Sequence, residues 1–185
     1  MKKYFRMGIM GALALALVAG PRAVYASAAK EIDASVEVAL EQFQKDVPGA
    51  KDLLKKAKGV LVFPHMMKGG FVIGAEYGEG ALRIDGKTVN YYNMINGSLG
   101  FQLGGQTRRI FILFMEALPL KEFREDPEWL GGANASGVFM TTGAEGSMDT
   151  MKTNKPIMTF VLDQKGLMYN LNLEVGKINK IEKDK

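Results

Sequence analysis

The 185-residue chain contains no cysteine and only one histidine, His65. Without cysteine there are no disulfides, no thiolate catalysis, no Cys-ligated zinc and no lipid anchored through a cysteine. A single histidine excludes any site that needs two imidazoles. The sequence shows no cluster of metal ligands, and we expect neither a metal nor another cofactor.

The chain also lacks a net charge once its first residues are set aside. It has 24 Lys and Arg against 20 Asp and Glu, a formal charge of +4. Four of these basic residues, and no acidic one, lie within residues 1–26, so the remainder carries 20 of each. Nucleic-acid binding is disfavoured, because that function requires a strongly basic face. An anionic partner would therefore have to bind to a local basic patch.

No apolar run is long enough to span a bilayer. The longest, Met7–Ala19, has 13 residues, against roughly 20 for a spanning helix. It follows Lys2, Lys3 and Arg6 and precedes Pro21 and Val24-Tyr25-Ala26. This order is typical of a secretory signal peptide. We predict a signal peptide over residues 1–26, cleaved after Ala26, and an exported mature chain. The alternative is an uncleaved membrane anchor.

Two helices are predicted at the start of the mature chain. The first carries an apolar stripe at spacings of three and four, between Ile32 and Val47, and polar residues on its other sides. Its polar face mixes acids with lysines, whereas interfacial membrane helices favour Lys and Arg there, so core packing is the favoured role. The second helix is predicted from about Pro48 to Lys58, with Gly59 as its stop.

From Val60 onward the pattern changes to short strands. Hairpin turns are predicted at Asp85-Gly86 and Asn96-Gly97, and a turn at Gln164–Gly166. Pro64 is expected to end the first strand, and a helix or turn is expected at Leu120–Leu130. The predicted strands are Val60–Phe63, Phe71–Ile73, Ala81–Ile84, Thr88–Ile95, Ser98–Leu103, Arg109–Met115, Val138–Thr141, Ile157–Leu162, Leu167–Leu173 and Lys177–Ile181.

Helices followed by many short strands predict an α+β fold. We expect N-terminal helices packed on a curved, mostly antiparallel β-barrel or sandwich, in one domain over residues 30–183. Glycine recurs within the strand-like stretches, for example at Gly78 and Gly80. Such glycines permit bulges or close backbone approach, which suits a tightly curved sheet.

Several segments, in order along the chain, resemble the SYLF domain family. They are 57–64 (AKGVLVFP), 68–80 (KGGFVIGAEYGEG), 91–92 (YY), 97–104 (GSLGFQLG) and 111–115 (FILFM). The resemblance implies a lipid-binding domain, since eukaryotic members bind membrane phospholipids, and bacterial members are commonly exported. It therefore implies a bacterial, periplasmic protein of the cell envelope. Some members bind actin, which we do not expect of an exported bacterial protein. The resemblance implies no catalytic motif.

A group of lysines is the strongest candidate site for an anionic lipid. Lys51, Lys55 and Lys58 fall at i, i+4 and i+7, with Lys56 beside them and Lys68 after Pro64. Each lysine near an anionic leaflet contributes roughly 1 kcal/mol. The resemblance points to the same region, because basic residues in the N-terminal part of eukaryotic members contact phosphoinositides. The alternative is a solvent-exposed helix face whose lysines contribute only to solubility.

The segment Pro64–Gly70 is interpreted as a loop that places Met66 and Met67 beside these lysines. Methionine is pliable and suits contact with apolar tails. The alternative is that both methionines fill the core. Lipid-binding residues are thus predicted to be Lys51, Lys55, Lys56, Lys58, Lys68, Met66 and Met67.

Catalysis is disfavoured. His65 has no triad context, since Gly97-Ser98 and Gly146-Ser147 lack the surroundings of a nucleophile elbow. Glu76 and Glu79 are three residues apart, which in a strand places them on opposite faces. We therefore expect a non-enzymatic phospholipid-binding protein. The alternatives are a structural or protein-interaction module of the envelope, with the sheet edges or the Trp129 region as its contact surface, and, less favoured, a hydrolase that uses His65.

Overall fold

The computed structural model describes residues 22–69, 73–99, 107–127, 138–140, 155–163, 166–167 and 176–183. Within these ranges three helices accompany one mostly antiparallel sheet, which confirms the predicted α+β class. The helices are α1 (Arg22–Asp46), α2 (Ala50–Lys56) and α3 (Ala117–Glu125). The strands are β1 (Gly59–Gly69), β2 (Ile73–Ile84), β3 (Lys87–Leu99), β4 (Arg108–Phe114), β5 (Val138–Met140), β6 (Ile157–Asp163), β7 (Gly166–Leu167) and β8 (Lys177–Ile181).

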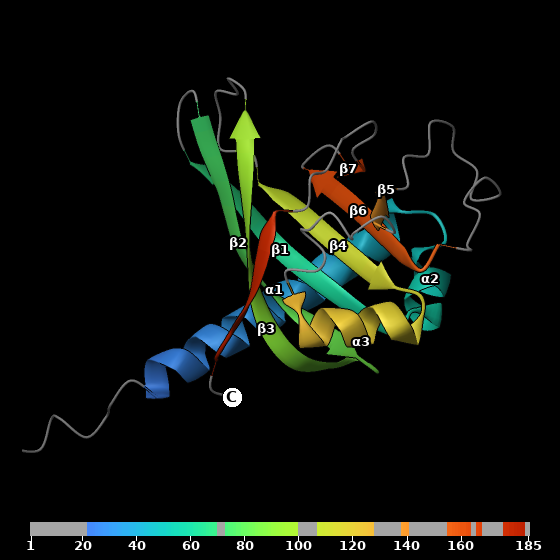
Figure 1. Cartoon of the computed structure of the whole chain (residues 1–185), viewed down its shortest axis with the longest axis horizontal. Coiled ribbons are helices and arrows are strands. Elements are labelled where there is room, and N and C mark those ends of the chain that lie inside the picture. The colour runs from blue at the N-terminus through green and yellow to red at the C-terminus, as the bar shows by residue number, and fades with distance from the viewer. Residues whose placement is uncertain are drawn as a thin grey trace, which may run out of the picture.

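The strands form one sheet in the order β5-β6-β4-β1-β2-β3-β8, with β7 also paired to β6 (Figure 1). The β5–β6 ladder is parallel and the other ladders are antiparallel. Among the described residues no ladder joins β8 to β5, so the sheet is open and a closed barrel is not supported. Helices α1 and α2 lie behind the sheet in Figure 1, and α3 lies in front.

Each face of the sheet supports its own core, because alternate residues of a strand point to opposite faces. The α1-face core combines α1 and α2 with residues such as Val62 and Phe111. The α3-face core combines α3 with neighbours such as Leu61 and Ile112. Strand β4 supplies both, because its apolar run is buried on two faces.

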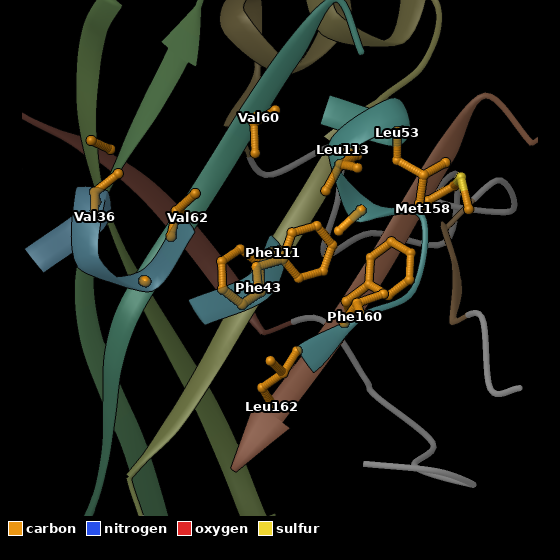
Figure 2. Close-up of a cluster of buried hydrophobic side chains, with 14 of the residues drawn as sticks. Val36, Phe43, Leu53, Val60, Val62, Phe111, Leu113, Met158, Phe160 and Leu162 are labelled. Carbon is orange, nitrogen blue, oxygen red and sulfur yellow. The ribbon is translucent and has the colours of Figure 1, made fainter. Parts of the chain in front are cut away.

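The α1-face core is built around Phe43 of α1. Its ring stacks on Phe111 of β4 with 4.5 Å between centroids and meets the edge of Phe160 of β6 at 5.1 Å (Figure 2). The apolar stripe of α1 is therefore turned into the protein, as the mixed charge of its polar face predicted. α1 begins at Arg22, within the segment predicted as a signal peptide.

Polar contacts also hold α1 to the sheet. Asp33 accepts hydrogen bonds from the hydroxyls of Thr88 (2.8 Å) and Tyr91 (3.0 Å), both on β3. Glu37 forms an ion pair with Arg83 of β2. Burial, reinforced by the hydrogen bond to Asp33, raises the pKa of Tyr91 to about 12. Among the polar side chains named here, Arg83 alone has a buried atom, Nε, without a hydrogen-bond partner.

The α3-face core centres on Phe123. Its ring lies 4.9 Å from that of Tyr92 on β3 and 5.1 Å from that of Phe114 on β4. The predicted helix at Leu120–Leu130 begins earlier, at Ala117, and α3 ends at Glu125. The Tyr92 hydroxyl is buried without a hydrogen-bond partner, and burial raises the pKa of Tyr92 to about 12.

One predicted hairpin turn is confirmed and the other is wrong. Asp85 (φ 50°) and Gly86 (φ 75°) join β2 to β3 with the two left-handed residues that a tight hairpin needs. Asn96 and Gly97 instead continue β3, where they pair with Glu76 and Ala75 of β2. Asn96 is buried and accepts a hydrogen bond from the Gly176 N–H (2.7 Å), so its amide serves tertiary contact.

The prediction that Pro64 ends the first strand is wrong. β1 continues to Gly69, and five residue steps from Val62 to Met67 match four steps on β2, from Ala81 to Tyr77. This bulge accommodates a proline inside a strand. Beside it, a side chain at Gly80 would collide with the carbonyl oxygen of Val62, so glycine there allows close approach, as expected.

The remaining strand predictions lie close to β4, β5, β6 and β8. The two strands predicted at 71–73 and 81–84 are joined in one strand, β2, which begins at Ile73. Some predicted elements, or parts of them, lie outside the described residues: 71–72, 100–103, 128–130, 141, 164–165 and 168–173. Trp129 is among these undescribed residues. Residues 126 and 127 are described but lie outside α3.

Candidate functional site

The four lysines Lys51, Lys55, Lys56 and Lys58 are all exposed at the α2 end of the molecule. We refer to them as the α2 lysine cluster. Within the described part of the chain none of them lies within ion-pair distance of a carboxylate. Four ammonium groups on eight consecutive residues, none with an ion-pair partner in the described ranges, make this a locally cationic surface.

The packing of α2 presents this cluster to solvent. The helix follows Gly49, whose φ of 74° allows the chain to reverse after α1. Ala50 and Leu53 are buried in the α1-face core and thereby turn Lys51 and Lys55 outward. The predicted single helical stripe is wrong for Lys58, because α2 ends at Lys56 and Ala57 is extended (φ −62°, ψ 135°). Lys58 is held instead by its N–H, which donates to the Phe114 carbonyl (2.7 Å).

The predicted loop with two methionines is part of β1, and its two methionines have opposite environments. Met66 is 1% exposed and belongs to the α3-face core, so it is unavailable for contact with a lipid. Met67 is 66% exposed. Alternation along the strand explains the difference, since neighbours point to opposite faces. The segment therefore does not form the predicted contact loop.

Lys68 and Met67 lie far from the α2 lysine cluster. β1 begins at Gly59 beside Lys58 and runs to Gly69. At about 3.3 Å per residue, Lys58 and Lys68 are separated by about 30 Å. The backbone of Lys68 pairs with Glu76 of β2. The predicted single patch is thus corrected to the α2 lysine cluster at one end of β1 and Met67 at the other.

Glu76 and Glu79 have different partners, as expected for residues on opposite faces of β2. Glu76 is buried and forms an ion pair with Arg108 of β4, while its Oε2 has no hydrogen-bond partner. Glu79 pairs with Lys183 (2.9 Å) and accepts a hydrogen bond from the Tyr77 hydroxyl (2.9 Å). Burial and this bond to Glu79 raise the pKa of Tyr77. These carboxylates do not form a paired-acid site.

His65 is exposed on β1 and makes no side-chain contact with a described hydrogen-bond partner. No group of three or more His, Asp or Glu residues in the described ranges is arranged to hold a metal ion. Across those same ranges we find no helix with the length and apolar content to cross a membrane.

Sequence reasoning missed a row of exposed apolar side chains. Met67, Tyr77 and Ile95 are each exposed and pair with one another across β1, β2 and β3. We call these three residues the apolar row. Alternating residues in the 73–84 segment indicate a strand there. The alignment of the three residues, however, depends on the β1 bulge and on the continuation of β3 past Ile95, which the sequence did not reveal.

Comparison with known proteins adds no relative: no family model matches the chain, and no curated protein matches it.

Proposed function

We propose that the protein is a non-enzymatic, periplasmic phospholipid-binding protein that associates with an anionic membrane surface through the α2 lysine cluster. The observation that carries this proposal is the exposure of four neighbouring lysines without an ion-pair partner among the described residues. The resemblance to the SYLF domain family supports the same class of ligand.

The proposed contact is electrostatic. Phosphate head groups provide the negative charge that the cluster lacks locally, where Asp52 is its one acidic neighbour in sequence. At roughly 1 kcal/mol per lysine, the cluster supports reversible attachment. Attachment should weaken with salt, because exposed charges are screened over about 8 Å at physiological ionic strength.

We also propose that the open sheet is curved and acts as a rigid scaffold for this surface. The β1 bulge and the close approach at Gly80 support curvature, since both increase local bending. α2 is anchored to that scaffold through Leu53, which is buried in the same core as Leu113 and Met158 (Figure 2). The lysines thus project from a fixed base.

The first prediction is that Lys51→Glu, Lys55→Glu and Lys58→Glu together reduce binding to anionic vesicles at low salt by at least about tenfold. Vesicle flotation measures the bound fraction. The matched control reverses three exposed lysines elsewhere, Lys30, Lys87 and Lys180, with the same change in net charge. Equal loss in both triple variants would mean that only total charge matters. Unchanged binding of the α2 variant would refute the proposed site.

A structural or protein-interaction module of the envelope is the second candidate. The supporting observation is β8, which forms one end of the described sheet and pairs with β3 alone. An edge strand offers backbone groups to a further strand. Cross-linking in cells separates the two candidates, because a stoichiometric protein partner without vesicle binding favours the module.

A further inference from the structure

The apolar row lies beyond the part of the sheet that helices cover. On β2 the α1-face core ends at Ala81, and Tyr77 lies four residues further, about 13 Å along the strand. On β3 the same interval separates Tyr91 from Ile95. Three neighbouring strands thus extend past α1 together, and their outer part carries the apolar row on the α1 side.

A polar belt separates the apolar row from the α1-face core. Glu79 and Asn93 are paired across β2 and β3, and Asn93 pairs with Asn179 of β8. The Asn179 amide donates to the Asn93 side chain (3.0 Å), and Lys183 pairs with Glu79 (2.9 Å). The apolar row is therefore a separate apolar surface rather than the margin of the core.

The orientation of Tyr77 links the row to this belt. Its hydroxyl donates to Glu79, so the polar end of the ring is directed toward the belt, while 45% of the residue is exposed. On the neighbouring strand β8, Ile95 pairs with Lys177, which is exposed, so the row ends at a charged residue on that side. On the opposite face at this level the charges of Glu76 and Arg108 are joined in an ion pair.

We propose that the apolar row is a membrane-insertion site, which enters the interfacial and outer acyl region of a lipid bilayer while the polar belt lies at the head groups. An apolar surface bordered by a tyrosine hydroxyl and a polar belt matches the change in polarity across that interface. This inference goes beyond the electrostatic contact above, because it requires no anionic lipid.

A bilayer fits the row better than a protein partner does. Stable protein interfaces involve roughly 20–30 residues on each side, whereas the row has three side chains bordered by a polar belt. Insertion into lipid needs no complementary partner surface, and each apolar side chain that leaves water contributes separately. A second copy of the chain is the principal competing occupant.

The test uses protein produced from the full-length chain and neutral phosphatidylcholine vesicles at 0.5 M salt, where the lysine contact is screened. Changing Met67, Tyr77 and Ile95 together to Thr, which strands tolerate, should lower the bound fraction at least about tenfold. The matched control changes Val38 and Leu118 to Thr, since each is 63% exposed and lies outside the row. Circular dichroism checks that each variant folds.

A second measurement avoids a triple substitution. The chain has no cysteine, so Met67→Cys or Val38→Cys carries a single environment-sensitive fluorophore. A blue shift at position 67 and none at 38, on addition of neutral vesicles, supports insertion. No shift at 67, or unchanged binding of the triple variant, overturns it. A shift at 67 that depends on protein concentration without vesicles also overturns it and assigns the row to self-association. Loss of binding in the lysine variant alone leaves this inference intact.

Discussion

The two faces of the sheet differ in how their buried polar groups are satisfied. On the α1 face, Asp33 accepts two hydrogen bonds from β3 and Glu37 pairs with Arg83. On the α3 face the hydroxyls of Tyr92 and Thr159 and one oxygen of Glu76 are buried without a partner, whereas on the α1 face Arg83 Nε is the one such atom among the described residues. α1 has 25 residues and α3 has nine, so the face with the longer helix also has the better-satisfied polar contacts.

This difference suggests distinct roles for the two cores. A buried polar group without a partner costs roughly 1–3 kcal/mol, whereas a made hydrogen bond contributes about 1 kcal/mol. The α1 face therefore combines apolar burial with polar contacts that set the position of the helix. The α3 face depends on apolar packing, chiefly of Phe123. We expect α1 to unfold with the sheet and α3 to be the more easily detached layer.

The largest expected effect comes from Phe43→Ala on the α1 face. Removing a ring packed against Phe111 and Phe160 leaves a cavity, and we expect a loss of about 3–5 kcal/mol in the free energy of unfolding. Phe123→Ala should cost less globally, because α3 buries only its Pro119, Leu120 and Phe123 and we expect it to detach alone. Urea unfolding measures the loss, and hydrogen exchange measures opening of α3. Equal losses without faster exchange in α3 would contradict the comparison.

An intermediate effect is expected at alkaline pH. Tyrosine has a pKa near 10 when unfolded, and the pKa of Tyr91 and of Tyr92 is raised to about 12 in the fold. The folded state retains protons that the unfolded state loses, so the contribution is present below pH 10 and is lost as pH rises to about 12. Ionisation of Tyr92 should account for about 2 kcal/mol of the unfolding free energy that is lost as pH rises from 10 to 12.

Urea unfolding between pH 9 and pH 12 measures this loss. Tyr92→Phe should make stability less dependent on pH over that range, and Tyr91→Phe should do so for the α1 face. If neither variant changes the slope, the burial of these hydroxyls does not control alkaline unfolding.

The smallest expected effect separates the two adjacent tyrosines at pH 7. Tyr91→Phe removes a hydrogen bond to Asp33 and should cost about 1 kcal/mol. Tyr92→Phe removes a buried hydroxyl without a partner and should be neutral or slightly stabilising. The urea midpoints of the two variants give the comparison directly. A greater loss for Tyr92→Phe would show that its hydroxyl has a partner after all.

Local signals predicted much of the fold. The period of the apolar residues identified the stripe of α1 and the strands β4, β6 and β8, because burial of one or both faces imposes that period. Asp85-Gly86 predicted its turn correctly, since both residues adopt left-handed conformations there. Asn96-Gly97 predicted a turn wrongly, because pairing with β2 and burial of Asn96 prevailed over local preference.

The candidate site was predictable only in part. The four lysines of α2 and its C-terminal flank are exposed as expected, because Leu53 fixes which side of the helix is buried. Met66 and Lys68 could not be placed from sequence, since the β1 bulge changes which residues share a face. The apolar row could not be predicted either, because its three residues are distant in sequence and are brought together only by strand register.

By itself, the sequence determined the absence of cysteine chemistry, the balance of 20 basic and 20 acidic residues after residue 26, the α+β class and the amphipathic character of α1. These properties follow from composition and local periodicity. Only the tertiary structure decided that the lysines and Met67 lie at opposite ends of β1, and that Met67, Tyr77 and Ile95 are neighbours. The physical reason is that strand pairing and a one-residue bulge determine which side chains share a surface, and neither is encoded by spacing along the chain.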